Sequence, residues 1–270
     1  MRIEPFTYTL AAREVHAPTV TDDKYSRGVV GFATGSPRFP GAAVLGVDAA
    51  LATGIGMIRY AGDEAVAAGV LARHPEIVVD PGRVTAWVVG SGMVSDDDES
   101  MMLARAALSE GVPSVVDAGA LTVLPVHHRV VATPHAGELA TALGVDRKVV
   151  MADPAAMALR AAIQWEATVV LKGSTTYVVN PLGDAFSLNL APTWLAMAGA
   201  GDTLAGIIGA LIATRSDDII ESGRALARIA ATGVLIHSVA AARASGGGPF
   251  RLDDLVAKIP GVVRDLVNHR

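Results

Sequence analysis

The chain has 270 residues, of which 51% are hydrophobic, so it is long enough and apolar enough to bury a large core. Its formal net charge is -5 and it has no basic run, which excludes the electrostatic pattern of a protein that binds nucleic acid or anionic membranes. It contains no cysteine, which excludes a disulfide framework and a thiolate site.

The start of the chain, MRIEPFTYTL, lacks the basic-then-apolar pattern of a signal peptide, and charge or glycine breaks the apolar runs well before ~18 residues. We therefore expect a soluble, cytoplasmic protein with no nucleic-acid or membrane partner. The seven histidines form no H-x-H or H-x-x-x-H pair, so we expect no metal site built by the protein. A metal ion would arrive with a phosphate.

Short β-branched runs alternate with Ala-rich stretches along most of the chain, which is the pattern of parallel strands joined by crossover helices. In the first half, strands are expected within 28–36, 86–92, 112–119 and the start of 129–144. Helices are expected at 41–54, where Gly54 ends the helix, at 100–111 and at the end of 129–144.

The second half opens with a helix around 153–166, after which the period changes to three short strands within 167–188. Their connections are K-G-S-T and N-P-L-G-D, and the second is a turn signal between hairpin arms. Helices are expected at 202–214, at about 218–244 and after SGGGPF. Since no repeat, charge block or low-complexity linker divides the chain, we expect one doubly wound α/β domain over 1–270 with a mostly parallel sheet.

The stretch AMAGAGD (196–202) places one carboxylate between tiny residues and an apolar helix. Gly199, Ala200 and Gly201 leave backbone N–H groups uncovered at the positive end of the helix dipole, which is typical of an anion site. Asp202 lies at or next to the expected N-cap, so helix capping alone is the simple explanation. A cap needs no glycines before it, and a carboxylate repels a bound anion. We therefore predict that Asp202 accepts a proton beside an anion hole, with capping as a second role.

Two further loops follow expected strands. VVLKGSTT (169–176) offers Lys172 and a hydroxyl-rich turn to phosphates, although an ordinary hairpin with a surface lysine explains it as well, and it is not a Walker A loop. VATPHAGEL (131–139) places His135 and Glu138 at the carboxyl end of a strand, where open α/β sheets bind ligands. The alternative there is a capping box begun by Thr133 or His135.

The segment 87–119 has the order strand, G-S-G, helix, strand and an acid, Asp117, as in a dinucleotide-binding fingerprint. Ser95 replaces the third glycine, and the aspartates at 96–98 lie where a pyrophosphate requires positive potential. These aspartates are better explained as a favourably charged first helical turn, so a Rossmann dehydrogenase is the less favoured interpretation. The Gly/Ser/Pro loop within 31–46 either lets a flat ligand approach the backbone or is an ordinary tight connection.

Five motifs occur in order: TGSPRFPGAAVLG, VVGSGM, VVDAGAL, TPHAGELATAL and VVLKGSTT followed by AGAGDTLAGIIGALIA. Together, from about residue 24 to 245, they resemble the ADP- or ATP-dependent NAD(P)H-hydrate dehydratases, carbohydrate-kinase-like proteins of the ribokinase fold. They are similar to that family's G-S-x-x-x-x-G-A, V-I-G-P-G-L, D-A-D-A-L, T-P-H-P-G-E and V-L-K-G…G-G-T-G-D motifs. The resemblance implies a three-layer α/β/α fold and repair of hydrated NADH or NADPH. In that repair a phosphoryl group passes from ADP, usual for bacterial members, or from ATP to the hydrate hydroxyl, and phosphate is then lost.

The resemblance also implies roles for individual residues. Asp202 would be the catalytic residue, and the amides of Gly199, Ala200 and Gly201 the anion hole. The nucleotide would be bound by Lys172, Gly173, Ser174, Thr175, Thr176 and Gly201. The hydrate would be bound by Ala42, Gly92, His135 and Asp202. A Mg²⁺ ion is expected to bridge phosphates and to be held largely by substrate and water.

The chain departs from the family motifs at Ala200, where threonine is usual, at Gly119, where a second acid is usual, and at Met197, where threonine is common. The family is commonly homotetrameric and often carries an epimerase domain ahead of this one. We therefore expect a homotetramer without the epimerase domain and a separate NAD(P)H-hydrate epimerase.

Two alternatives stay open. A ribokinase-type kinase of a hydroxymethylpyrimidine, a thiazole or a sugar shares the G-x-G-D motif, but T-P-H-x-G-E resembles the dehydratases more. A non-catalytic nucleotide sensor would need the anion cradle but not a base, and the presence of Asp202 and Lys172 argues against it.

Overall fold

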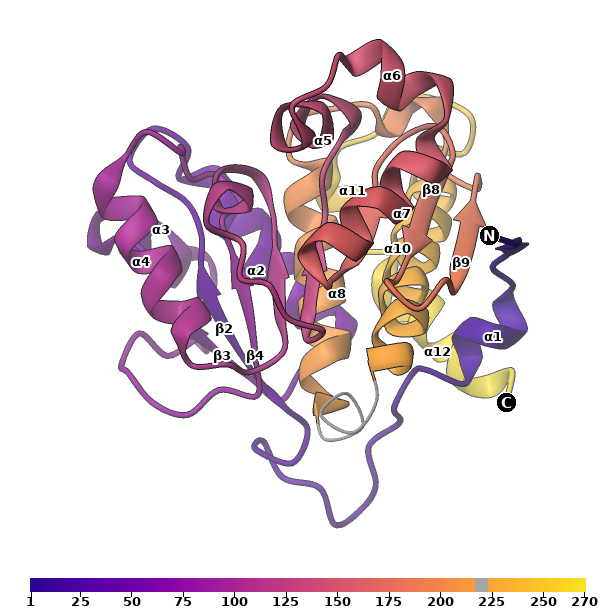
Figure 1. Cartoon of the computed structure of the whole chain (residues 1–270). Helices are drawn as coiled ribbons and strands as arrows, with labels where there is room; N and C mark the ends of the chain where they lie inside the picture. Colours follow the sequence, from indigo (N-terminus) through magenta and orange to yellow (C-terminus); the bar gives the residue numbers. More distant parts are fainter. Residues whose placement is uncertain (217–222) are drawn as a thin grey trace.

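The computed structural model describes residues 1–216 and 223–270, which form one nine-stranded sheet with helices on both faces (Figure 1). The strand order is β1-β9-β8-β7-β6-β5-β4-β2-β3. Successive side chains of a strand face opposite layers, so Val30 and Phe32 join one hydrophobic core and Val29 and Ala33 join the other. The predicted three-layer α/β/α fold with a mostly parallel sheet is confirmed.

The strands are short and mostly buried on both faces, as in other sheets covered by helices on each side. They are β1 (Ile3–Pro5), β2 (Val29–Ala33), β3 (Met57–Tyr60), β4 (Ala86–Val89), β5 (Ser114–Val116), β6 (Val130–Ala132), β7 (Thr168–Leu171), β8 (Thr176–Val179) and β9 (Ala185–Leu188). The run β3-β2-β4-β5-β6-β7 is parallel, and so is the pair β1-β9. The pairs β7-β8 and β8-β9 are antiparallel, which confirms the three short strands predicted within 167–188.

The helices form two layers, one against each face of the sheet. One layer holds α1 (Tyr8–Ala12), α2 (Gly41–Thr53), α3 (Glu64–Arg73), α8 (Ala200–Ala213), α10 (Gly223–Ser245), α11 (Leu252–Val256) and α12 (Ile259–Asn268). The other holds α4 (Asp98–Ser109), α5 (Ala136–Leu143), α6 (Arg147–Ala152) and α7 (Pro154–Trp165). Two short 3₁₀ helices, η1 (Ala118–Val123) and η2 (Thr193–Leu195), lie in loops.

Several predicted helix boundaries hold and others change. Gly54 ends α2 in the left-handed conformation, with a φ of 101°, as predicted. The helix predicted from 202 begins two residues earlier, at Ala200. The start predicted at about 218 lies outside the described residues, and the described part of that helix is α10. The helices α1, α3 and α6 and the strands β1 and β3 were not predicted.

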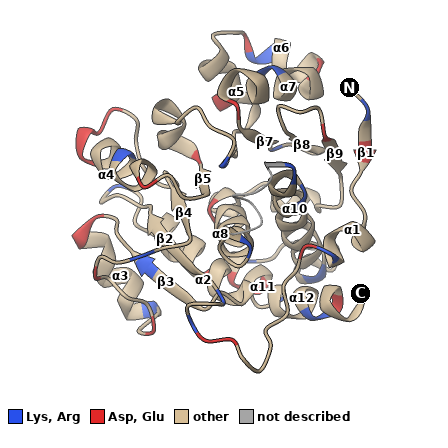
Figure 2. Ribbon diagram, turned by 60° about the horizontal axis from the view of Figure 1, so that its bottom comes forward, with Lys and Arg blue, Asp and Glu red and all other residues tan. Residues whose placement is uncertain are grey.

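Helix α10 is the one helix among the described residues that is long and apolar enough to cross a membrane, by length and composition alone. Its most apolar window, within Arg224–Ser245, is 83% buried inside the molecule. Figures 1 and 2 show α10 beside α8, and the two helices are in contact. This burial is typical of a core helix. Basic and acidic residues are interspersed over the elements that Figure 2 draws.

Helices α2 and α8 approach each other through glycine. A Cβ at Gly206 of α8 would overlap the carbonyl oxygen of Gly46 in α2. A Cβ at Gly46 would lie 3.1 Å from the Phe32 ring and 3.4 Å from the Asp202 carbonyl oxygen. This backbone-to-backbone contact fixes where the first turn of α8 lies relative to the sheet.

Candidate active site

The carboxyl ends of the parallel strands β2, β4, β5, β6 and β7 lie at one edge of the sheet, and the loops that follow them are tied together there. The Gly35 N–H, after β2, donates to the Ser91 carbonyl, after β4, at 2.7 Å. The Lys172 N–H, after β7, donates to the Pro134 carbonyl, after β6, at 2.9 Å. The predicted site loops are therefore neighbours in the structure.

A buried ion pair joins two of these loops. Lys172 Nζ lies 2.8 Å from Oδ1 of Asp117. Asp117 is the residue directly after β5, and it is 2% exposed. Asp117 also accepts hydrogen bonds from the hydroxyls of Thr133, at 2.7 Å, and Ser91, at 3.0 Å. Burial raises the pKa of Asp117, but Lys172 and the two hydroxyls outweigh it and hold the pKa below its usual value. Lys172 Nζ is also 4.0 Å from Glu138 Oε2.

Asp202 is the third residue of α8 and does not cap it. The N-cap is Gly199, with a φ of 89°, and no side chain caps this helix. The predicted capping role is therefore wrong, because the helix begins at Ala200, two residues before the carboxylate. Burial and the charge of Asp117 raise the pKa of Asp202 to about 6, and Lys172 partly opposes them. A carboxylate with a pKa near 6 is ionised at neutral pH and can accept a proton.

The two glycines of AMAGAGD, Gly199 and Gly201, are needed for different structural reasons. Gly199 needs its left-handed conformation, and a Cβ there would lie 2.5 Å from Leu45 and 2.7 Å from Leu252. A Cβ at Gly201 would instead lie 3.3 Å from Lys172 Nζ. The bare backbone of the first turn of α8 thus adjoins the buried ion pair, and the first N–H groups of a helix favour anions.

Ala42 and Gly92, both predicted to bind the hydrate, lie together although they are 50 residues apart in the chain. Gly92 has a φ of 72°, and a Cβ there would lie 2.5 Å from Ala42 Cβ and 2.9 Å from the Phe39 carbonyl oxygen. The Ser36 hydroxyl donates to the Gly92 carbonyl at 2.7 Å. The tight turn after β4 therefore packs against the start of α2.

His135 is the N-cap of α5 and forms the capping box that was the structural alternative. Its Nδ1 accepts hydrogen bonds from the N–H groups of Gly137 and Glu138, both at 3.0 Å. Glu138 Oε2 accepts the His135 N–H at 2.7 Å. The His135 side chain is 60% exposed, and its backbone pairs with that of Lys172 in an isolated bridge. Of the remaining predicted nucleotide residues, Gly173, Ser174 and Thr175 form the turn between β7 and β8, and Thr176 is the first residue of β8.

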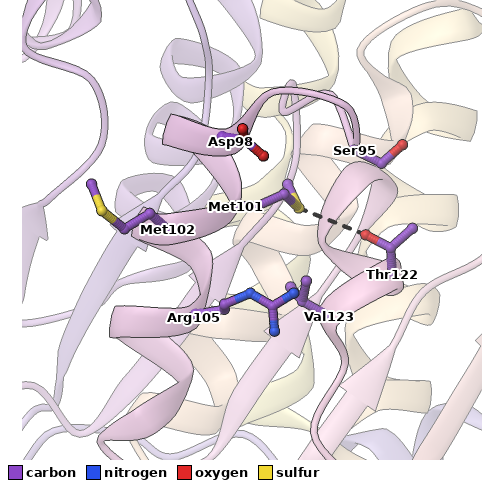
Figure 3. A pocket seen from close by; sticks show the side chains of 7 residues that line it. All are labelled: Ser95, Asp98, Met101, Met102, Arg105, Thr122 and Val123. Carbon is purple, nitrogen blue, oxygen red and sulfur yellow. Dashed lines mark hydrogen bonds between the residues drawn. The ribbon is translucent and has the colours of Figure 1, made fainter.

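The departure at Gly119 has a steric reason. A Cβ at this position would lie 2.5 Å from the Met93 carbonyl oxygen and 3.2 Å from the Ser95 nitrogen, so an acidic side chain does not fit. A surface cavity of about 450 Å³ lies close by, between α4 and η1 (Figure 3). It is lined by Ser95, Asp98, Met101, Met102, Arg105, Thr122 and Val123. None of the predicted site residues lines it.

The sequence interpretation missed two polar residues. Asp117 was considered only as a ribose partner, and its pairing with Lys172, 55 residues away, was not anticipated. An acid directly after a buried strand is the signal that could have found it. His237, buried on α10 beneath the first turn of α8, carries no motif around it.

Known proteins are similar to this chain over most of its length. The model of the NAD(P)H-hydrate dehydratase family matches residues 30–255. The bifunctional NAD(P)H-hydrate repair enzyme Nnr of Mycobacterium tuberculosis is 41% identical over 225 residues, 77% of this chain and 46% of that protein. The chain thus spans about half the length of such bifunctional relatives. The ADP-dependent (S)-NAD(P)H-hydrate dehydratase of Xanthomonas campestris is 32% identical in an alignment that covers 95% of this chain and 96% of that protein.

Solved structures show the same fold. The ADP/ATP-dependent NAD(P)H-hydrate dehydratase from Bacillus subtilis, co-crystallised with ATP/Mg²⁺, has a TM-score of 0.85 at 23% identity, over 98% of this chain and 99% of that one. Hydroxyethylthiazole kinase from Pyrococcus horikoshii has a TM-score of 0.62 at 18% identity, over 97% and 95%. Since the family model covers most of the chain and the five motifs converge on one edge of the sheet, the chain belongs to the NAD(P)H-hydrate dehydratase family.

Proposed function

We propose that this chain is an ADP-dependent (S)-NAD(P)H-hydrate dehydratase that repairs hydrated NADH and NADPH. The observation that carries the proposal is a carboxylate of raised pKa, Asp202, in an uncapped first helical turn beside the Lys172–Asp117 pair. The match to the Xanthomonas relative supports it, because nearly the whole of both chains aligns.

In the first step Asp202 accepts the proton of the hydrate hydroxyl while the hydroxyl oxygen attacks the terminal phosphorus of ADP and AMP leaves. A base with a pKa of about 6 is mostly ionised at neutral pH and is suited to this transfer. The amides of Gly199, Ala200 and Gly201, with the nearby ammonium of Lys172, stabilise the charge on the oxygens of the transferred group.

In the second step the ring loses phosphate together with a proton, which restores the double bond of the dihydronicotinamide. The sum of the two steps converts hydrate and ADP to NAD(P)H, AMP and phosphate. The same amides stabilise the departing phosphate dianion. Ala42, Gly92 and His135 would hold the hydrate at the carboxyl edge of the sheet. Residues 173–176, the turn after β7 and the first residue of β8, would hold the nucleotide with Lys172 and Gly201.

The donor set suits a Mg²⁺ ion that arrives on the nucleotide. Asp117 already accepts hydrogen bonds from Lys172 and two hydroxyls. Residues 1–216 and 223–270 contain no cluster of three or more His, Cys, Asp or Glu suited to a metal. Bound to the phosphates, Mg²⁺ would neutralise part of their charge.

The assembly and the cellular setting follow from the same proposal. We expect a homotetramer in the cytoplasm, working with a separate epimerase that interconverts the two hydrate epimers. The bifunctional naming of several relatives supports the need for a second activity beside this one. Sedimentation velocity of the purified chain measures its assembly, and a monomer would contradict the tetramer.

The strongest competing function is a ribokinase-type small-molecule kinase, because the chain shares its fold with hydroxyethylthiazole kinase. The distinguishing experiment supplies NADH hydrate, ADP and Mg²⁺ and quantifies AMP, phosphate and NADH. A dehydratase yields the three in equal amounts. A kinase leaves the hydrate unchanged and forms a stable phosphorylated product only when its own alcohol, such as a hydroxymethylpyrimidine, a thiazole or a sugar, is supplied with a nucleoside triphosphate. A sensor binds the nucleotide and consumes none in either mixture.

A further inference from the structure

His237 is a buried histidine that the proposed chemistry does not use. It lies on α10, is 5% exposed, and places its Nε2 3.0 Å from the Thr203 hydroxyl. Thr203, in α8, donates its N–H to the Gly199 carbonyl at 3.1 Å and its hydroxyl to the Ala200 carbonyl at 2.9 Å. A side chain of α10 therefore reaches the first turn of α8 through one threonine.

The first turn of α8 has no side-chain cap, and its Ala200 N–H makes a long backbone hydrogen bond, of 3.4 Å, to the Met197 carbonyl. Its N-cap, Gly199, has no side chain to accept a backbone N–H, and Gly201 adds backbone freedom within the turn. The amides of an anion hole stabilise developing charge only if they are oriented before that charge appears. An anchor beneath this turn is therefore a requirement of the proposed chemistry.

The hydrogen bonds define the state of the imidazole. The Thr203 hydroxyl has one proton and donates it to the Ala200 carbonyl, so the neutral tautomer that fits this arrangement is the one whose Nε2–H donates to the threonine oxygen. Burial lowers the pKa of His237 to about 4; the nearby Ala200 backbone opposes this shift, and the charge of Lys172 adds to it. At neutral pH the ring is uncharged and adds no second cation beside Lys172.

We propose that His237 is a positioning residue, which fixes the first turn of α8 through Thr203 so that the amides of Gly199, Ala200 and Gly201 point at the transferring phosphoryl group. This inference rests on the proposed function. His237 touches no ligand in this account and acts only through the turn above it.

Three single variants test the proposal. His237→Leu keeps a similar volume without the donor, His237→Gln offers an amide N–H near the place of Nε2, and Thr232→Val is the control. Thr232 is a buried residue of α10 whose hydroxyl bonds the Arg228 carbonyl of its own helix. We expect His237→Leu to lower kcat about tenfold with the hydrate KM within about twofold, and His237→Gln to recover most of the loss. The control should change kcat less than about twofold.

A double variant checks the route through Thr203. If His237 acts through this hydroxyl, Thr203→Val lowers kcat similarly, and His237→Leu combined with Thr203→Val is no worse than the poorer single variant. Losses that multiply would mean that the two residues act independently, which would overturn the proposal.

Amide hydrogen exchange gives a readout that does not depend on activity. We expect the Thr203 amide to exchange about tenfold faster in His237→Leu, and to exchange as in the native chain in His237→Gln and Thr232→Val. If the native chain proves to have no dehydratase activity, the proposed function fails, and the exchange rates still decide whether His237 anchors the turn. Unchanged exchange and kcat in His237→Leu overturn the inference, as do equal losses of kcat in the Leu and Gln variants.

Discussion

Asp202 is held in a state that favours chemistry over stability. Burial and the neighbouring Asp117 carboxylate disfavour its ionised form and raise its pKa to about 6. Lys172 does not cancel this effect, because it makes its 2.8 Å contact with Asp117. An ionised group that the folded state disfavours costs stability, and such groups concentrate at functional sites.

Replacing the base should separate turnover from binding. We expect Asp202→Asn to lower kcat at least ~100-fold and to leave nucleotide affinity nearly unchanged, because an amide cannot accept the hydroxyl proton. In the native chain, kcat/KM should rise with pH through about 6 as Asp202 ionises. Steady-state kinetics across pH measure both. The matched control is Asp98→Asn, an exposed acid in the first turn of α4, and an Asp202→Asn variant with unimpaired turnover would refute the assignment.

The same carboxylate should make stability depend on pH. Its folded pKa of about 6 exceeds its ordinary value of 3.8, so the folded state binds the proton more tightly than the unfolded state does. The resulting stabilisation is complete below pH 3.8 and is lost as the pH rises through about 6. Asparagine does not titrate, so the free energy of unfolding of Asp202→Asn minus that of the native chain should increase by about 2 kcal/mol as the pH rises from about 4 to 7.5. Urea unfolding at several pH values measures this gain, and a constant difference across pH would contradict the account.

The Lys172–Asp117 pair has a structural and a functional consequence. Lys172→Ala leaves the Asp117 carboxylate buried without its cation, so we expect the free energy of unfolding to fall by about 3 kcal/mol. Adding Asp117→Asn should recover part of this loss, since the uncompensated charge is removed.

Lys172→Ala should also weaken nucleotide binding more than hydrate binding. Calorimetric titration with each ligand measures the two affinities. An unchanged nucleotide affinity would mean that the turn at Lys172 and Gly173 only connects two strands and does not bind the nucleotide.

At the scale of elements, the glycine contact between α2 and α8 sets the position of the catalytic turn. A Cβ at Gly206 would overlap the Gly46 carbonyl oxygen, so the two helices would have to separate. We expect Gly206→Ala to lower the free energy of unfolding by about 3 kcal/mol and to reduce activity, because α8 carries Asp202.

The control for this variant is Gly69→Ala, in the middle of α3. A Cβ at Gly69 would have no atom within 4 Å beyond the adjacent residues and backbone of its own helix, so alanine should stabilise the helix by about 0.5–1 kcal/mol. Thermal and denaturant unfolding of the two variants measure the contrast. Equal effects from both alanines would mean that the α2–α8 contact does not constrain the fold.

The elements differ in how well the sequence predicts them. Helix α2 was predicted with its ends because Gly54 marks the stop, and β7 to β9 because the hydrophobic period changes at 167. Strand β1 is exposed and contains Glu4, and β3 contains Arg59, whereas the strands that were predicted contain no charged residue. Neither therefore appears in the sequence as an uncharged strand-like run. The start of α8 was misplaced because Gly199, a weak signal in sequence, is its N-cap.

At the scale of the whole molecule, the parallel strand order creates the site. The sequence indicated that the residues at 42, 92, 135, 172 and 202 act together, but only through the resemblance of five motifs. Pairings across the fold, such as Asp117 with Lys172 and His237 with Thr203, depend on which strands and helices are neighbours. Sequence periodicity does not determine that order, so these partners could not be predicted.

The most direct test of the account is the return of dihydronicotinamide absorbance when NADH hydrate and Mg²⁺ are mixed with the native chain and ADP, with ATP in a parallel sample. The account predicts recovery with ADP in the native chain and almost none with Asp202→Asn. No recovery with either nucleotide, or equal recovery in the native chain and in Asp202→Asn, would contradict it.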